Sequence, residues 1–538
     1  MAEVQKVIKN NQSIVPFFGE RLSFIRGLDP LGLQNTSDAT FSYLLPGLNN
    51  VTGRIRYYSF YCWLLDQYSK QVGSTNPEHQ RKFIRTAEYI IALTSQFYEG
   101  DNSSIPGSNY ARLEVMSDIQ VHDLNAAIAK SDGSTVNTYW NFRWGAFGQY
   151  YLGSLRDIGI IIDHEGSGGV YTRTNSRNNE FISGEMLAQA FDQNIPHEKK
   201  QLFFSYLSKG QISNEQIENL LPEFNLTKVK TNTQEQELLI NLLIQKDYPL
   251  RIEEEPSTLR KDTFKHLLKF VEIEPDNFDD RQFVYFAYDC KGLIEGKRES
   301  SLLGWYYYQF NEFWHYANTS LFNGSLDYLE DIHGLDWLPL NQFVDEVSNL
   351  VLEKFISENL VQENTTKVSQ MLANLQPEEY QYLERTHKSR KIDKIFYGFL
   401  LMFSEYLNNL EEMSLLKEFG ENNNLAKDGE GAGYFLQQFG GKLSMPLTEY
   451  IREYIFKKII YRHQYIAFRK IRGGGLSTQK FIIEDHHIRY LGNFEAGYTA
   501  PRLGSLISYL RDLNVVADDS VLTEFGRNIL TELYSTND

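Results

Sequence analysis

Two stretches of the sequence, Leu155-Arg-Asp-Ile-Gly-Ile-Ile161 and Leu510-Arg-Asp-Leu-Asn-Val-Val516, follow the same pattern. Each begins with residues that suit a helix, passes through Gly159 or Asn514, and continues into β-branched residues. Glycine and asparagine tolerate the left-handed backbone conformation that ends many helices, so we expect a helix to stop at each of them. A strand, a turn, a second short strand and another helix should follow.

This order resembles that of winged-helix modules, in which a recognition helix runs into a two-stranded wing and a closing helix follows. The resemblance places one module at residues 136–195, with its closing helix from Gly184. It places the other at residues 475–538, with its closing helix from Gly526. Winged helices bind either DNA or proteins, so the resemblance implies one of these two uses.

Two such modules joined by a long helical body are similar to the layout of kleisin-type subunits of bacterial chromosome-structuring complexes and plasmid- or phage-defence complexes. That resemblance implies a non-catalytic, DNA-associated or scaffold subunit whose partners are double-stranded DNA and an ATPase or nuclease subunit. The chain departs from the kleisin layout because residues 1–135, largely helical, precede the first module. A divergent nuclease or other effector enzyme and a winged-helix transcriptional regulator stay open as alternatives.

At 538 residues the chain is longer than a single hydrophobic core usually supports. We expect a mainly α, multidomain protein. Its four expected segments are an N-terminal helical domain (1–135), the first winged-helix-like module (136–195), a central helical domain (196–440), and a basic helix with the second module (441–538). Apolar residues three and four positions apart predict helices over Arg54–Lys70 and Gln80–Tyr98. The aromatic run from Trp305 to Ala317 is expected to lie in a helical core.

Charge and cysteine content restrict the class of protein further. The net charge of -17 opposes general adhesion to nucleic acid, which depends on cationic side chains. Cys62 and Cys290 stand among aromatic residues and are expected to be buried in a protein of a reducing compartment. The apolar run from Ile395 to Phe403 is too short to cross a bilayer, and the N-terminal residues lack the apolar core of a secretory signal. We therefore expect a cytoplasmic protein without membrane contact.

Cationic residues are concentrated in two segments. Residues 385–394 contain five lysines and arginines and one acidic residue, and residues 452–480 contain eight and one. In the second segment, a helical step of about 100° per residue places four cations and two tyrosines on one side. These residues are Lys458, Arg462, Arg469 and Arg472, with Tyr454 and Tyr465. Such a stripe can hold a phosphate backbone, and it is equally compatible with the solvated face of an amphipathic helix.

Arginines of the two modules are the other candidates for nucleic-acid contact. They are Arg143, Arg156, Arg173 and Arg177 in the first module and Arg502 in the second. The first four suit a protein interface as well, which the acidic composition favours. Because the basic helix adjoins the second module, we expect nucleic acid to contact that end of the chain. The first module is expected to pack internally or to dock a protein.

No metal, cofactor or catalytic residue is expected. Glu312 and His315 stand one helical turn apart, but carboxylate-bridged metal sites need a second pair of this kind, so a buried histidine paired with its neighbour is the expectation. His486 and His487, beside acidic residues, could belong to a nuclease. The surrounding sequence instead favours a β-hairpin with Asp485 and His486 in its turn.

Overall fold

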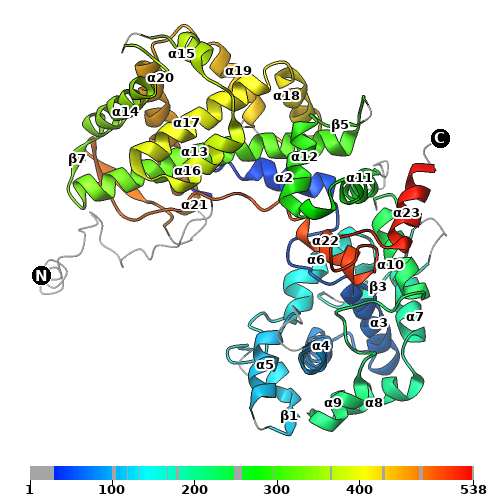
Figure 1. Cartoon of the computed structure of the whole chain (residues 1–538). Coiled ribbons are helices and arrows are strands. Elements are labelled where there is room, and N and C mark those ends of the chain that lie inside the picture. Colours follow the sequence, from blue (N-terminus) through cyan, green and yellow to red (C-terminus); the bar gives the residue numbers. More distant parts are fainter. Residues whose placement is uncertain are drawn as a thin grey trace, which may run out of the picture. The chain divides into compact units, whose positions relative to one another are not determined.

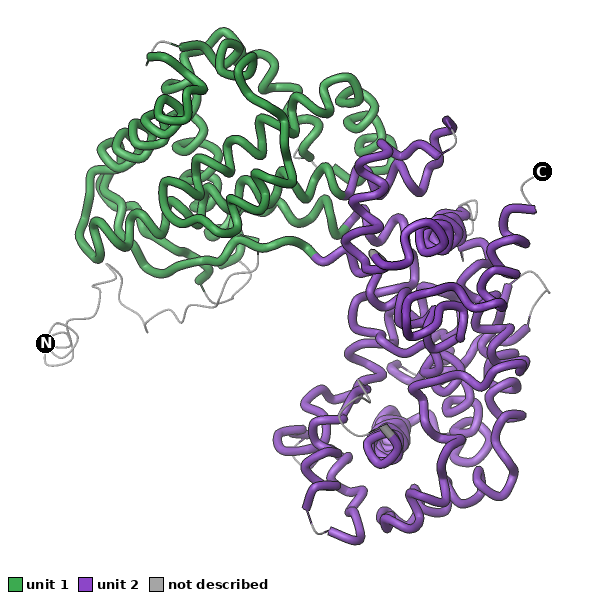
Figure 2. The backbone as a smooth tube through the Cα atoms, in the orientation of Figure 1, with its two compact units in different colours: residues 1–38, 309–499 green, residues 39–308, 500–538 purple. Residues whose placement is uncertain are grey.

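The structure, a computed structural model, describes residues 29–99, 105–117, 119–130, 133–165, 168–176, 181–247, 257–294, 296–363, 366–426, 431–471 and 477–535. It is mainly helical, as predicted, with short strands in small sheets (Figure 1). The chain divides into two compact units (Figure 2). Unit 1 consists of Met1–Asp38 and Gln309–Thr499, and unit 2 consists of Ala39–Tyr308 and Ala500–Asp538.

The two units differ from the four consecutive segments expected from the sequence. Each unit combines stretches that are far apart along the chain. The expected 441–538 segment is divided, since residues up to Thr499 belong to unit 1 and residues from Ala500 onward belong to unit 2. The physical reason is that a helix buries its apolar face against whichever helix is adjacent in space, and sequence order does not record that choice.

Unit 2 is built around α3 (Arg56–Gln71), in which every residue from Arg56 to Asp66 is buried. A helix that is buried on all sides belongs in the middle of a domain. Helix α7 (Gly184–Gln193) and strand β3 (Tyr171–Arg173) pack against it. The other helices are α4 (Pro77–Glu99), α5 (Ser108–Met116), η2 (Leu124–Ala127), η3 (Phe147–Tyr151), α6 (Leu152–Asp157), α8 (His197–Lys209), α9 (Asn214–Leu220), α10 (Gln234–Ile244), α11 (Leu259–Ile273), η4 (Pro275–Asn277), α12 (Asp280–Asp289), α22 (Gly504–Asp512) and α23 (Glu524–Ser535).

The strands of unit 2 are short and antiparallel. Strand β2 (Ile161–Asp163) pairs with β3 and forms the hairpin expected after Gly159. The other pairs are β1 (Val121–Asp123) with β4 (Gln211–Ser213) and β5 (Leu293–Ile294) with β6 (Lys297–Arg298). In the second stretch, the hairpin is reduced to an antiparallel bridge between Val516 and Leu522.

The helix ends in the two similar stretches have the same geometry. Gly159 and Asn514 follow α6 and α22 and have φ angles of 84° and 57°, the left-handed conformation that the sequence predicts. The same three backbone hydrogen bonds occur in each stretch. In the first they run from Ile158 N–H to Ser154 O (3.0 Å), from Gly159 N–H to Arg156 O (3.0 Å) and from Ile160 N–H to Leu155 O (3.0 Å). In the second they run, in the same order, from Leu513 N–H to Tyr509 O (2.9 Å), from Asn514 N–H to Arg511 O (3.0 Å) and from Val515 N–H to Leu510 O (2.8 Å).

A threonine and a glycine complete each stretch in the same way. Thr174 and Thr523 accept the backbone N–H of Gly184 (2.9 Å) and Gly526 (3.0 Å) at their hydroxyls. The same hydroxyls donate to the carbonyl oxygens of Gly159 (3.0 Å) and Asn514 (2.7 Å). The two stretches are therefore an internal structural repeat. Their identity as winged helices stays a prediction.

The two repeats meet at Tyr58 of α3. The Tyr58 hydroxyl is 2.8 Å from Ser154 Oγ and 3.4 Å from Tyr509 Oη. Ser154 and Tyr509 hold equivalent positions, one residue before the leucine of each Leu-Arg-Asp sequence. Tyr509 Oη also donates to Thr52 Oγ1 at 2.7 Å. This buried hydroxyl network fixes both repeats against the central helix of unit 2, since a buried hydroxyl without a partner is costly.

Unit 1 is built around the part of α13 (Ser300–His333) that follows Tyr308. Residues 309–329 are buried, in agreement with the core expected from the aromatic run. Trp314 lies 5.5 Å from Phe435, centroid to centroid. The other helices are α14 (Leu340–Ser357), α15 (Val368–Asn374), α16 (Glu379–Lys388), α17 (Lys391–Asn408), α18 (Met413–Asn422), α19 (Ala432–Gly440), α20 (Leu447–Tyr454), η6 (Ile455–Tyr461) and α21 (Arg462–Ile471). Helix α2 (Asn35–Leu44) and α13 both contain a boundary between the units.

The β-hairpin expected around His486 is confirmed in unit 1. Strands β8 (Phe481–Glu484) and β9 (His487–Tyr490) pair antiparallel. Asp485 and His486 form the two-residue turn, with φ angles of 46° and 61° that match the twist of a hairpin. Strand β7 (Leu338–Pro339) adds to the other edge of β9.

Two smaller expectations concern the membrane and the cysteines. Within the described ranges, no helix has both the length and the apolarity needed to cross a membrane. The apolar run from Ile395 to Phe403 lies within α17 and is buried except for half-buried Tyr397, in agreement with the prediction of a buried helix. Cys62 is fully buried, and burial raises the pKa of its thiol, whereas Cys290 is only half-buried. Both cysteines are free.

Candidate nucleic-acid interface

The basic helix of the sequence consists of three consecutive segments, α20, η6 and α21. The middle segment is π-helical, with hydrogen bonds between residues five apart, so each residue turns the chain by less than the 100° of an α-helix. Side chains that an ideal α-helix would align are therefore separated. The single stripe expected from the sequence becomes a buried side and an exposed side.

Tyr454 and Arg462 lie away from the exposed side. Tyr454 is 3% exposed, and its hydroxyl donates to Asn318 Oδ1 at 2.5 Å. Arg462 is half-buried and donates from Nε to the carbonyl oxygen of Leu31 (2.5 Å) and from Nη2 to that of Gly32 (3.2 Å). The predicted stripe includes both residues, but here they hold unit 1 together.

His463 and Lys470, like Arg462, donate hydrogen bonds to the segment before α2. Lys470 Nζ donates to Asp29 O at 2.6 Å. The backbone N–H of Lys480 donates to His463 Nε2 at 3.0 Å, so Nδ1 carries the ring proton and donates to Pro30 O, also at 3.0 Å. Burial lowers the pKa of His463 to about 4, which keeps the imidazole neutral in this arrangement.

The exposed side carries an aromatic and cationic surface, which we call the η6–α21 face. It consists of Lys457, Lys458, Tyr461, Tyr465, Phe468 and Arg469. Tyr461, Tyr465 and Phe468 are 42%, 58% and 68% exposed. The sequence prediction includes only Lys458, Tyr465 and Arg469 of these six. The spacing of four and three residues from Tyr461 to Phe468 was the available signal for the others.

Two cations of the face lie against aromatic rings, one within the face and one in α19. The Arg469 guanidinium lies 5.6 Å from the centroid of the Tyr465 ring, and Lys458 Nζ lies 5.3 Å from that of Phe435. Both distances are typical of cation–π contacts. An arginine stacked on an exposed ring keeps its hydrogen-bond donors at the edge of the guanidinium available to an anion.

The cations of the other basic segment, residues 385–394, have partners within unit 1. These partners are side chains of α13, α16 and α17. The pairs are Lys388 with Glu384, Arg390 Nε with Asp327 (3.5 Å), Lys391 Nζ with Asp331 (2.6 Å), Lys394 Nζ with Asn323 Oδ1 (2.8 Å), and the Arg385 guanidinium with the Tyr397 ring (5.7 Å). Asp393 of the same segment pairs with Lys354 at 2.7 Å. On the η6–α21 face, Lys457 pairs with Glu453 at 3.0 Å, whereas Lys458 and Arg469 lie against aromatic rings. The contacts of these two cations make the η6–α21 face the stronger candidate for binding an external anion.

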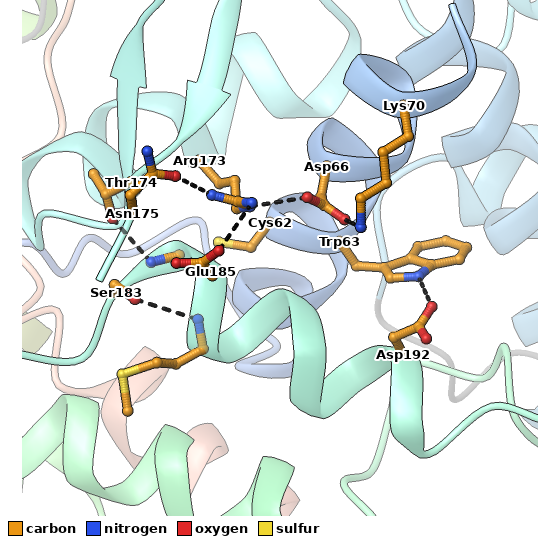
Figure 3. A network of polar contacts seen from close by, with 12 residues as sticks. Cys62, Trp63, Asp66, Lys70, Arg173, Thr174, Asn175, Ser183, Glu185 and Asp192 are labelled. Carbon is orange, nitrogen blue, oxygen red and sulfur yellow. Dashed lines mark hydrogen bonds and ion pairs between the residues drawn. The ribbon is translucent and has the colours of Figure 1, made fainter. Parts of the chain in front are cut away.

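Arg173 of the first repeat is a structural residue (Figure 3). It extends from β3 and donates from Nε to Asp66 Oδ1 of α3 at 3.0 Å. Its Nη2 donates to Glu185 Oε1 of α7 at 3.3 Å, and its Nη1 donates to the side chain of Asn175. With its side chain 18% exposed, Arg173 joins the hairpin to both helices. Its donors are occupied, so it is a poor candidate for contact with phosphate.

The remaining arginines of the prediction are also held locally or lie outside the described residues. Arg143 is exposed and paired with Glu78, and Arg156 is exposed and paired with Asp163 of its own hairpin. The Arg502 guanidinium lies 5.0 Å from the centroid of the Phe41 ring. Arg177 and Arg472 fall outside the described residues.

The two helices expected from the sequence to be recognition helices, α6 and α22, differ in exposure. In α22, all of whose residues are described, only Gly504 is exposed, and most side chains are buried. In α6, Gly153, Arg156 and Asp157 are exposed. The sequence favours the second repeat for nucleic-acid contact, but a helix covered in this way has no face to place in a DNA groove. The basic helix before it belongs to the other unit.

Of the pair considered for metal binding, Glu312 has hydrogen-bond partners within unit 1. It accepts hydrogen bonds from Ser37 Oγ and, at 2.7 Å, from the backbone N–H of Thr499. His315 Nδ1 lies 3.9 Å from Glu312 Oε1, too far for a hydrogen bond, and it is buried without a hydrogen-bond partner among the described residues. Among the described residues, no group of three or more histidine, cysteine, aspartate or glutamate side chains could hold a metal ion.

We compared the chain with protein-family models, curated proteins and solved structures. No protein-family model, curated protein or solved structure matches the chain.

Proposed function

We propose that this chain is a non-catalytic subunit of a multiprotein complex and that it contacts nucleic acid through the η6–α21 face. The observation that carries the proposal is the exposure of three aromatic rings beside Lys457, Lys458 and Arg469 on one helical surface. Cations release counterions from a phosphate backbone, and aromatic rings stack on bases. The net charge of -17 makes contact elsewhere on the chain unfavourable, so a local cationic surface would determine where nucleic acid binds.

A scaffold role in protein–protein contact is the second candidate. Phe468 and Tyr465 are the most exposed aromatic residues of this face, and exposed aromatic side chains are enriched at protein interfaces. The similarity of the two-module layout to kleisin-type subunits supports assembly with a cytoplasmic ATPase or nuclease subunit. In a scaffold role, a partner protein and not nucleic acid would cover the η6–α21 face.

The test is fluorescence anisotropy of a labelled oligonucleotide, single-stranded and duplex, at increasing salt concentrations. We expect the wild-type chain to bind and the double variant Lys458→Glu, Arg469→Glu to lose at least tenfold in affinity. Its slope of log affinity against log salt should also be smaller by about 2, because about one counterion is released per phosphate contact.

The matched control is the charge-reversal pair Lys82→Glu and Lys209→Glu, two exposed lysines of unit 2. It changes the net charge of the chain by the same amount and leaves the η6–α21 face intact. Equal loss in both double variants would show a general charge effect and contradict the proposal. Absence of binding by the wild-type chain, together with co-purification of a protein partner that the Lys458→Glu, Arg469→Glu variant loses, would favour the scaffold role.

A further inference from the structure

A pocket of about 310 Å³ lies in unit 2, where α5 begins. Its walls come from the loop 50–53 before α3, from residues 105–110, from residues 139–140, and from the end of η3. None of the described residues that line it is charged. Five of them are aromatic, namely Tyr110, Tyr139, Trp140, Tyr150 and Tyr151.

Two buried ionisable side chains hold the aromatic walls in place. Arg85, 1% exposed, donates from Nη2 to the carbonyl oxygen of Trp140 at 2.9 Å. Glu88, 2% exposed, accepts hydrogen bonds from the Tyr139 hydroxyl and, at 2.7 Å, from the backbone N–H of Phe147 at the start of η3. Such side chains are costly to bury unless their hydrogen bonds are made, so these contacts fix the walls firmly.

Asn49 ties the loop 50–53 to the opposite wall. Its Nδ2 donates to the carbonyl oxygen of Tyr150 at 2.9 Å. Its Oδ1 accepts the backbone N–H groups of Val51 and Thr52, both at 2.9 Å. The shape of the pocket is therefore set by the fold, and a ligand would lose little free energy in ordering it.

The volume of the pocket suits a ligand of two fused rings. An engineered cavity of about 150 Å³ binds one benzene molecule, and this pocket has about twice that volume. Sites for small molecules have volumes from roughly 300 to 1,000 Å³. The edge of the pocket is open to solvent, because Asn50, Val51 and Asn109 are exposed.

The aromatic rings of the pocket leave surface for a ligand to contact. Tyr110, Trp140 and Tyr150 are half-buried, so part of each ring is accessible. The Trp140 and Tyr150 rings lie 5.4 Å apart at an interplanar angle of 82°. A flat ring that stacks on one of them meets the other edge to face, and both arrangements are favourable. The pocket therefore suits a planar aromatic ligand.

The polar groups of the pocket narrow the ligand further. The carboxamides of Asn50 and Asn109 each offer a donor and an acceptor. This pair complements adenine, whose amino group and ring nitrogen also present one donor and one acceptor side by side. A phosphate group requires cationic partners, which the described lining of the pocket does not supply. The complementary ligand is therefore an uncharged base.

We infer that this pocket binds adenosine or a closely related unphosphorylated purine nucleoside, with the base among Tyr110, Trp140 and Tyr150 and its polar edge at Asn50 and Asn109. The inference is independent of the proposed function, because the pocket belongs to unit 2 and the η6–α21 face belongs to unit 1. An adenine of a nucleic-acid strand shares this chemistry, but a strand brings phosphate groups for which the lining has no cation.

The experiment is isothermal titration calorimetry of the full chain with adenosine, adenosine monophosphate, glucose and oligoadenosine. We expect adenosine to bind and glucose not to bind. Adenosine monophosphate should bind at least about fivefold more weakly than adenosine, because its phosphate meets an acidic chain without a cation in the pocket. Trp140→Ala should weaken adenosine binding by about tenfold, since base stacking on an aromatic side chain contributes on that order.

A second variant guards against a loss of fold in Trp140→Ala. Asn50 and Asn109 are exposed, so the double variant Asn50→Ala, Asn109→Ala should fold normally and also bind adenosine about tenfold more weakly, as expected for the loss of paired contacts to the base edge. Two matched controls should bind like the wild-type chain. They are Trp337→Ala, at a tryptophan that is 40% exposed in unit 1, and Asn528→Ala, at an exposed asparagine of α23.

The other ligands decide between this inference and its alternatives. Absence of adenosine binding, or equal binding by Trp140→Ala and Trp337→Ala, would overturn the inference while the proposed function stands. Binding of glucose in place of adenosine would overturn the assignment of a base. Oligoadenosine that displaces adenosine from the pocket would assign it to a base of a strand and overturn the free nucleoside.

Discussion

Alanine in place of Gly184 or Gly526 is expected to destabilise unit 2 by about 3 kcal/mol, an effect of the size caused by overpacking a close contact. A Cβ atom at Gly184 would lie 2.2 Å from the carbonyl oxygen of Ile160, and a Cβ atom at Gly526 would lie 2.1 Å from that of Val515. Both obstacles are backbone atoms of the residue that follows the left-handed helix end, and they cannot rotate away as a side chain can. The helix that contains each glycine would have to move away from this backbone.

Urea denaturation followed by circular dichroism measures this effect. Gly153→Ala is the matched control, since Gly153 lies in α6 and a Cβ atom there meets nothing within 4 Å. Alanine at that helical position should be neutral or stabilise by about 0.5–1 kcal/mol. If Gly184→Ala and Gly526→Ala are as stable as Gly153→Ala, the close packing that defines the structural repeat is contradicted.

Protonation of His463 is expected to destabilise unit 1 by about 3 kcal/mol as the pH falls from 6.5 to 4. Burial lowers the pKa of this histidine from 6.5 to about 4 in the folded chain, so the unfolded chain binds the proton more tightly. Its contribution to stability is complete above pH 6.5 and is lost as the pH falls toward 4. Protonation at Nε2 would also remove the acceptor for the Lys480 N–H.

The measurement is the difference in free energy of unfolding between the wild-type chain and His463→Asn at a series of pH values. Asparagine can still donate to Pro30 O but does not titrate, so the variant should be less stable at pH 8 and the difference should shrink below pH 6.5. His197→Asn, at an exposed position in α8, provides the control. A difference that stays constant down to pH 4 would show that His463 does not titrate as expected.

The repeated helix ends could be predicted from sequence because they depend on local chemistry. Gly159 and Asn514 mark the ends of α6 and α22, and the β-branched residues after Gly159 form β2. The hairpin turn at Asp485 and His486 was predictable for the same reason. Left-handed conformation and β-propensity are properties of a few consecutive residues, so no distant contact was needed to find them.

The candidate binding face could be predicted only in part, because its geometry depends on a departure from the α-helix. The π-helical segment moves Tyr454 and Arg462 away from Lys458 and Arg469. The residues that decide this arrangement, such as Asn318, belong to other parts of unit 1. A helical wheel assumes the same rotation at every residue and shows no partner from elsewhere in the chain. It therefore cannot tell an exposed cation of the helix from one held in a buried contact.

The predicted arginines show the same limit in another form. The sequence makes Arg173 and Arg469 equal candidates for contact with nucleic acid. In the structure, Arg173 has Asp66 and Glu185 as partners, whereas Arg469 stacks on exposed Tyr465. The acidic partners of Arg173 come from α3, which lies far before β3 in the sequence, and from α7, which follows β3. Whether a cation is available to a ligand depends on its counterions, and those are known only from the packed structure.

The most direct test of the central claim is photocrosslinking of the wild-type chain to an oligonucleotide that contains 5-iodouracil, followed by mass spectrometry of the crosslinked peptides. Iodouracil reacts with aromatic side chains in contact with the base, so the site is located without any substitution. We predict crosslinks at Tyr461, Tyr465 or Phe468, which the oligonucleotide without iodine would not form. Crosslinks confined to residues 136–195, or binding without any crosslink in residues 455–471, would contradict the assignment of nucleic-acid contact to the η6–α21 face.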